Sequence, residues 1–176
     1  MALIDGMLRE LEEEAVTTRR VLERVPDNRL GWRPHPKART LGELALHVAI
    51  VPGGVAQLIA SPSPARTPQV GQDPSPASSS ELMPALDQSI ATAKQVLGGM
   101  DDGALTATWR MTNGERELFA TTRAAMLRSI MLNHWYHHRG QLTVYLRELG
   151  VPIPSIYGPS ADENPFATSR TSAAAV

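Results

Sequence analysis

The chain contains no cysteine among its 176 residues. This absence excludes disulfides, iron–sulfur clusters, zinc sites built from thiolates and a cysteine nucleophile. An excess of one charge is also missing, because 17 Lys and Arg residues are balanced by 18 Asp and Glu residues. A chain with a net charge of −1 lacks the basic surface of a general nucleic-acid binder, so we expect no nucleic-acid partner.

Long apolar runs and a basic N-terminal segment are missing as well. No stretch approaches the roughly 20 uninterrupted apolar residues of a membrane span. The segment Met1–Ala15 is rich in acidic residues, unlike a secretory signal, which begins with basic residues and an apolar run. We therefore expect a soluble, cytoplasmic protein with no membrane partner. A chain of this length typically forms one domain with a substantial core.

Four segments repeat apolar residues at the spacing of an α-helix. They are a first segment of about 20 residues that ends at Pro26, and residues 40–60, 81–97 and 121–149. Thr40 and Glu43 form a capping box at the start of the second segment, and Pro52 is expected to kink or loosen its middle. Between residues 100 and 120, weak alternation and the pair Asn113-Gly114 allow a short hairpin. With no convincing sheet, the pattern predicts an all-α four-helix bundle.

The segment 61–80 is a low-complexity connector. Five prolines and six serines fill 11 of its 20 positions. Connections between neighbouring antiparallel helices usually take about 2–8 residues. This longer connector could cross the bundle, so that the second and third helices run parallel. We expect one domain over residues 1–167 and a flexible tail over residues 168–176.

Three of the five histidines are expected to face the bundle interior. At about 100° per residue, His134 and His138 lie about 40° apart on the apolar face of the last helix. The same arithmetic places His47 on the apolar face of the second helix. An unpaired polar group in a core costs about 1–3 kcal/mol, so three buried imidazoles need a common partner.

A divalent metal would be such a partner. Neutral imidazole is the commonest metal ligand, and two histidines four residues apart on one helix can reach one ion. Three such ligands leave coordination positions open, as in catalytic sites. We expect zinc or nickel, with iron or cobalt as alternatives. The alternative interpretation is that these are core histidines held by hydrogen bonds.

We predict the environment of each remaining polar and aromatic residue near these histidines separately. His35 is expected to be a solvated loop residue. His137 lies at the edge of the apolar face, and Gln141 lies between that edge and its centre, so either could orient water or substrate. The alternative for Gln141 is a glutamine at the edge of the core with no such role. Trp135 and Tyr136 fall outside the apolar face, which suggests a subunit interface or a satellite core. Three arginines are expected to face solvent: Arg128, Arg139 and Arg147.

The sequence resembles the DinB family, also called DinB/YfiT-like metalloenzymes. The resemblance rests on residues 44–47 (LALH), 133–142 (NHWYHHRGQL), 145–147 (YLR) and 151–163 (VPIPSIYGPSADE). It implies a four-helix bundle that binds a metal through His47, His134 and His138. Members are often dimers, and several relatives are transferases or isomerases that use a low-molecular-weight thiol. The family name refers to induction by DNA damage, which points to a stress response.

Three functions follow as hypotheses. The first is a metal-dependent transferase that uses an external low-molecular-weight thiol and a small-molecule substrate, with Gln141 or His137 orienting the acceptor. The second is a metal-dependent hydrolase with an activated water, although no carboxylate shares the face of His134 to serve as a general base. The third is a non-enzymatic metal-binding protein of a stress response. A homodimer is expected in each case. The segment Tyr157–Glu163 could border the site, or it could be a rigid C-terminal wrap.

Overall fold

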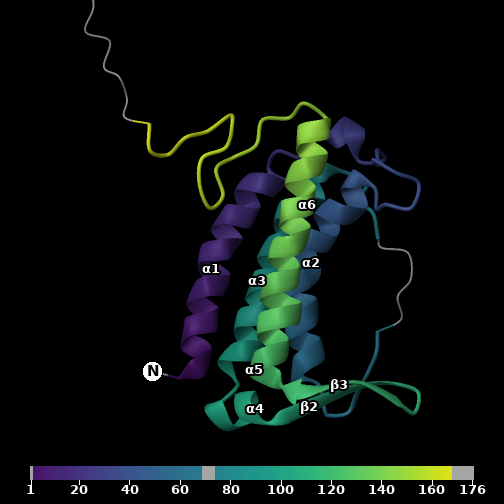
Figure 1. Ribbon diagram of the computed structural model, residues 1–176, viewed down its shortest axis with the longest axis vertical. Helices are drawn as coiled ribbons and strands as arrows, with labels where there is room; N and C mark the ends of the chain where they lie inside the picture. Colours follow the sequence, from purple (N-terminus) through teal and green to yellow (C-terminus); the bar gives the residue numbers. More distant parts are fainter. Residues whose placement is uncertain (1, 69–73, 168–176) are drawn as a thin grey trace, which may run out of the picture.

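The computed structural model describes residues 2–68 and 74–167. Within these residues, four long helices lie side by side (Figure 1). They are α1 (Leu3–Leu22), α2 (Leu41–Ala60), α3 (Leu82–Gly98) and α6 (His134–Glu148). The helical bundle is confirmed, but the all-α class is not, because a small sheet closes one end of the molecule.

The sheet is formed by one short strand and a hairpin. Its strands, in spatial order, are β1 (Ala65–Arg66), β2 (Thr108–Asn113) and β3 (Arg116–Thr122). β1 pairs with β2 in parallel, and β2 pairs with β3 in antiparallel orientation around Gly114, whose φ is +60°. Trp109 and Met111 of β2 are buried, whereas every residue of β3 is at least partly exposed. The apolar alternation in the hairpin is therefore too short to predict a sheet from the sequence.

The described ends of the connector between α2 and α3 lie at opposite ends of the bundle: β1 belongs to the sheet, and Ser75 and Pro76 lie beside Gly42 at the start of α2. In Figure 1, both helices run toward the end that carries the sheet and α4 (Asp102–Thr106), whereas α1 and α6 run the opposite way. The crossover is thus confirmed, and α2 and α3 are parallel neighbours. Residues 69–73 of the connector and the predicted tail 168–176 lie outside the described residues, and the domain boundary at residue 167 stays a prediction.

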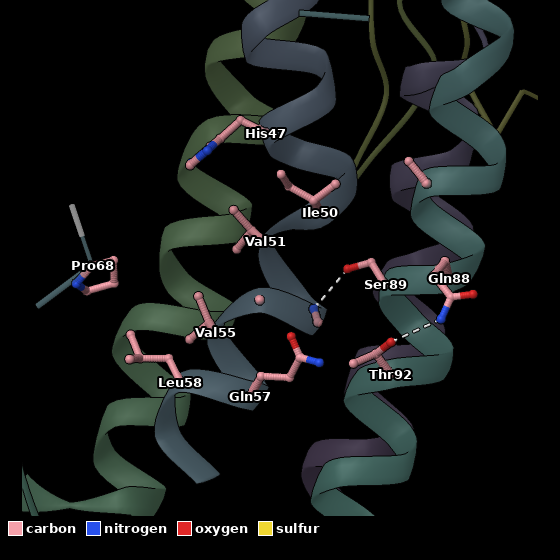
Figure 2. Close-up of a pocket in the computed structure, with 13 residues that line it drawn as sticks. His47, Ile50, Val51, Val55, Gln57, Leu58, Pro68, Gln88, Ser89 and Thr92 are labelled. Carbon is pink, nitrogen blue, oxygen red and sulfur yellow. Dashed lines mark hydrogen bonds between the residues drawn. The ribbon is translucent and has the colours of Figure 1, made fainter. Parts of the chain in front are cut away.

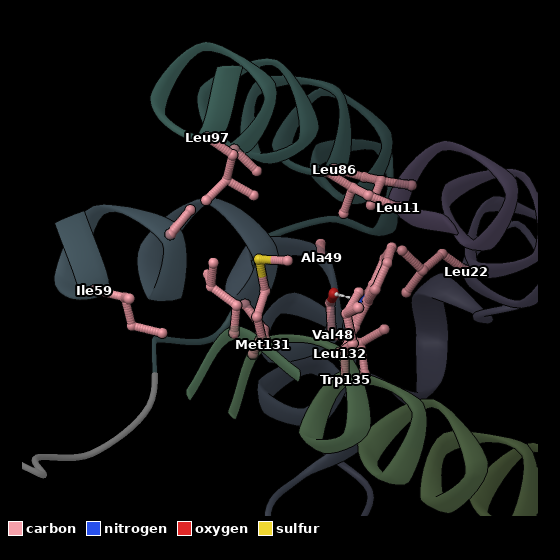
Figure 3. Packing of buried hydrophobic residues seen from close by; sticks show 14 of the residues in the cluster. Leu11, Leu22, Val48, Ala49, Ile59, Leu86, Leu97, Met131, Leu132 and Trp135 are labelled. Carbon is pink, nitrogen blue, oxygen red and sulfur yellow. Dashed lines mark hydrogen bonds between the residues drawn. The ribbon is translucent and has the colours of Figure 1, made fainter. Parts of the chain in front are cut away.

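Pro52 lies inside α2, which nevertheless continues unbroken from Leu41 to Ala60. A proline has no N–H to donate to the carbonyl four residues earlier, here that of Val48. The indole N–H of the fully buried Trp135 donates to this carbonyl instead, at 2.8 Å (Figure 3). The bond satisfies the freed carbonyl and fixes α2 against α6, and Met131 and Leu132, just before α6, also enter the core (Figure 3).

Gly53 allows α2 and α3 to approach closely. Its N–H donates to the Ser89 hydroxyl at 2.8 Å (Figure 2), and a Cβ added there would lie 2.8 Å from the Ser89 carbonyl oxygen. Contacts this short are essentially never made by a real Cβ. The next residue, Gly54, has nothing within 4 Å of an added Cβ. The first glycine is therefore required by packing and the second is not.

The last predicted helix begins two residues later than expected and has three parts. Thr121 and Thr122 belong to β3, and the Thr122 hydroxyl accepts from the Ala125 N–H at 3.2 Å. The helical parts are α5 (Arg123–Met126), the π-helical segment η3 (Leu127–Asn133) and α6. The π-helical segment ends immediately before His134 and sets the rotation at which α6 begins.

The apolar content of α2 is explained by its place in the bundle. Among the described residues, α2 is the one helix long and apolar enough to cross a membrane by length and composition, although Glu43, His47 and Gln57 interrupt its apolar run. Half of its most apolar window is buried inside the protein. α2 therefore has the burial of a core helix, and the absence of a membrane partner stays a prediction.

Candidate metal centre

The structure brings His47, His134 and His138 together between α2 and α6. The Nε2 atoms of His47 and His134 lie 3.2 Å apart, and one ring nitrogen from each of the three lies within 4.8 Å of the others. The His138 ring packs edge-on against both partners, at centroid distances of 4.6 Å to His47 and 4.3 Å to His134. The interior cluster predicted from helical spacing is thus formed.

Local features that the sequence encodes fix the start of α2 and the spacing of the two histidines on α6. The capping box of α2 is present: the Glu43 N–H donates to the Thr40 hydroxyl at 3.1 Å, and the Thr40 N–H donates to the Glu43 carboxylate at 2.6 Å. His47 lies two turns into this helix. His134 and His138, at the start of α6, stand one turn apart on one face, as ligands to a common ion require.

Burial favours the neutral form of His138 and His134 at physiological pH. His138 is 7% exposed, and burial, with the charges of its histidine and arginine neighbours, lowers its pKa to about 4. Burial likewise lowers the pKa of His134, with smaller effects from His137 and Arg39. Neutral imidazoles present lone pairs without first losing a proton, as metal ligation requires.

Gln141 selects the tautomer of His138. Its side-chain carbonyl lies 2.7 Å from His138 Nδ1 and can only accept, so this ring nitrogen carries the proton. The other nitrogen, Nε2, is then left with its lone pair for an ion. Hydrogen bonds of this kind orient the histidine ligands of most metal sites. Gln141 itself is exposed.

The other two histidines lie outside the cluster. His137 is exposed, and its ring centroid lies 5.0 Å from that of His138, so it borders the cluster without joining it. His35 is exposed in the loop before α2, as expected. Any role of Gln141 or His137 toward substrate stays a prediction.

Trp135 and Arg139 are buried, contrary to the sequence-based prediction for both. Trp135 is 0% exposed and Arg139 is 1% exposed. The Arg139 guanidinium pairs with the Glu14 carboxylate at 2.6 Å and donates to the Thr18 hydroxyl at 3.1 Å and to the Tyr157 hydroxyl at 2.5 Å. The prediction failed because α6 packs against α1 as well as α2, so two of its faces are covered.

The segment Tyr157–Glu163 forms the C-terminal wrap. Asp162 pairs with Arg147 of α6, and Glu163 pairs with Arg20 of α1. Arg147 is exposed, as predicted, whereas Arg128 is half-buried and pairs with Glu10. The wrap therefore joins the two helices.

Two cavities adjoin the histidine cluster and differ in character. A cavity of 570 Å³ follows the outer face of α2 from His47 to Leu58 and reaches α3, with mostly apolar walls (Figure 2). A second cavity, of 340 Å³, is polar and includes His138, Gln141 and Arg39 in its wall. The cluster thus contributes His47 to one cavity and His138 to the other.

The donor set fits a divalent transition metal. Three neutral imidazole nitrogens suit zinc, nickel, cobalt and ferrous iron and would leave positions for a further ligand. The spacing, burial and tautomer of the histidines all agree with such a site. The profile of the DinB family matches residues 2–168. The chain belongs to the DinB family.

One relative and two solved structures are similar to this protein along most of the chain. The Bacillus subtilis (strain 168) protein YrdA, described as uncharacterized, is 29% identical over 163 residues, which cover 91% of each chain. A DinB-like protein from Bacillus cereus ATCC 10987 superposes with a TM-score of 0.69 at 23% identity, covering 87% of this chain and 97% of that one. The DinB-like protein YjoA from Bacillus subtilis gives 0.61 at 17% identity, covering 82% and 92%. These two structures show a shared fold.

Proposed function

We propose that this DinB-family protein is a metal-dependent transferase that joins an external low-molecular-weight thiol to a small acceptor. One observation carries the proposal: the three-histidine cluster lies between a polar cavity and an apolar one. A transfer between two molecules needs two binding places beside one reactive centre. The chain has no cysteine, so the thiol must come from outside.

His47, His134 and His138 would hold the cation, with zinc or nickel preferred and iron or cobalt as alternatives. When bound, a divalent cation lowers the pKa of a thiol that reaches it, so that the thiolate is available at neutral pH. The chain's own side chains favour metal binding at this cluster. Burial favours the neutral form of His134 and His138, and Gln141 fixes the orientation of His138.

The proposed reaction is a substitution at an electrophilic carbon. A sulfur–carbon bond forms while the bond between that carbon and its leaving group breaks. The leaving group departs with the electron pair, and the thiol proton passes to solvent. We assign the thiol to the polar cavity and the acceptor to the apolar one, because an uncharged carbon electrophile is better matched by apolar walls.

Hydrolysis is less well supported than transfer. A hydrolase of this type uses a general base to take a proton from water. Among the described residues, no aspartate or glutamate lines either cavity. The third hypothesis, metal binding without turnover, is separated from both by activity measurements.

The test is a conjugation assay with zinc- or nickel-loaded protein, 2-mercaptoethanol as thiol and 1-chloro-2,4-dinitrobenzene as acceptor. We expect conjugation above the uncatalysed rate, and a fall to that rate in His134→Ala. Arg116→Gln, on the distant hairpin, is the matched control and should retain the rate. Thiol-independent ester hydrolysis would instead support the hydrolase, and full metal occupancy without turnover would support the structural role.

A further inference from the structure

The polar cavity beside His138 carries positive charge. Lys37 and Arg39 line it together with Gln141 and Tyr145. Among the described residues, no carboxylate lines its wall. Three neutral imidazoles would not offset the charge of a divalent cation, so the occupied site would be more positive still. An anionic ligand is the chemical complement of such a cavity.

The charge of Arg39 reaches the functional side of the cavity. Arg39 is half-buried and lines the same cavity as His138. It also opposes the rise that burial causes in the pKa of Tyr145 on the opposite helix. Because Arg39, His138 and Tyr145 line the same cavity, a small ligand held there can contact the guanidinium and reach His138.

The backbone next to these cations is already satisfied. At the start of α2, the N–H groups of Leu41 and Gly42 donate to the carbonyl oxygens of Trp32, at 2.7 Å, and Leu30, at 2.9 Å. The N–H of Glu43 donates to the Thr40 hydroxyl. Phosphate sites at helix N-termini depend on free N–H groups, and here the first turn offers none of these three. Recognition must come from side chains, and a guanidinium matches a planar carboxylate.

We propose that Lys37 and Arg39 form a subsite for a carboxylate group of the ligand that enters the polar cavity. The subsite orients that ligand so that its other end reaches the histidine cluster. This inference rests on the proposed function for the identity of the reacting end, which is the sulfur of the thiol. It adds the substrate class: a thiol that carries a carboxylate.

The test compares three thiols that differ in one group: 3-mercaptopropionate, 3-mercapto-1-propanol and 2-mercaptoethylphosphonate. Their dissociation constants are measured by calorimetry on cobalt-loaded protein. We expect the carboxylate to bind about tenfold more tightly than the alcohol and more tightly than the phosphonate. The advantage over the alcohol should be lost in Arg39→Gln, reduced in Lys37→Gln, partly kept in Arg39→Lys and unchanged in Arg116→Gln.

Two controls separate this inference from the proposed function. Repeating the titration of 3-mercaptopropionate on metal-free protein should again show weaker binding to Arg39→Gln than to the wild type. The visible spectrum of the cobalt-loaded protein changes when a sulfur atom coordinates the cobalt. If neither 3-mercaptopropionate nor 3-mercapto-1-propanol changes this spectrum, the proposed function fails while the subsite stands. Equal affinities for the carboxylate and the alcohol, equal affinities in wild type and Arg39→Gln, or tighter binding of the phosphonate would each overturn the subsite.

Discussion

Gln141 acts on the site through His138. Its carbonyl accepts the Nδ1 proton at 2.7 Å, and so leaves Nε2 free for an ion. Replacing it by alanine should lower metal affinity by about 10–100-fold, the usual effect of removing such a partner. Competition with a chromogenic chelator measures the change. Gln141→Glu keeps an acceptor and should retain most of the affinity, as should Val144→Ala on an exposed position of the same helix. Wild-type affinity in Gln141→Ala would contradict this role.

At the residue scale, the sequence predicted the histidine set because helical spacing alone places His134 and His138 on one face. It could not predict the hydrogen bond of Gln141, since that depends on the side-chain conformations of both partners. Arg139 was misplaced because a helix in a bundle has two covered faces. Its guanidinium is buried with Glu14 from α1, a residue 125 positions earlier in the chain. No local pattern contains that pairing.

Adjacent glycines of α2 provide a prediction at the element scale. Alanine is favoured over glycine in a helix interior by about 1 kcal/mol. Gly54→Ala should therefore raise the free energy of unfolding by about this amount, because an added Cβ meets nothing within 4 Å. Gly53→Ala should lower it, because its Cβ would meet the Ser89 backbone at 2.8 Å. Urea unfolding of both variants measures the difference, and equal effects would contradict the close approach of α2 and α3.

The secondary-structure elements differ in how clearly the sequence predicts them. α1, α2 and α3 were predicted within a few residues because their apolar periodicity agrees with their caps and terminators. The hairpin was only weakly indicated, because one strand supplies its buried side chains. The π-helical segment η3 has no sequence signal that we recognise, since it depends on how the helix meets the sheet and α2.

Across the whole molecule, Glu10 ties the first helix to the last. Its carboxylate accepts two bonds from Arg128, at 2.6 and 2.5 Å, and one from the Tyr136 hydroxyl at 2.8 Å. The bond from Arg128 is the largest influence, and the pKa of Glu10 is lowered although burial opposes the change. A carboxyl with a lowered folded pKa stabilises the fold above its unfolded pKa, and the stabilisation is lost as pH falls through the folded value.

Glu10→Gln should therefore lower the free energy of unfolding by roughly 1 kcal/mol at pH 7 and by less as the pH falls below about 4.5. Urea unfolding at pH 7 and pH 3.5 measures the trend. Glu13→Gln, an exposed neighbour in α1, should change stability little at either pH. A destabilisation by Glu10→Gln that is the same at both pH values would show that its charge has no part in joining the helices.

The homodimer, the stress-response role and the cytoplasmic location stay predictions at this scale. The exposed aromatic pair that suggested a subunit interface is not present, because Trp135 lies in the core and Tyr136 is half-buried against Glu10. Light scattering of the purified protein measures the oligomeric state directly.

The central claim is that His47, His134 and His138 bind one metal ion. Metal analysis of protein purified without a metal-binding tag tests it most directly, with His134→Ala and the neighbouring His137→Ala measured in parallel. We predict one equivalent of divalent metal per chain in the wild type and in His137→Ala, and loss of that equivalent in His134→Ala. Full stoichiometric metal in His134→Ala would contradict the claim.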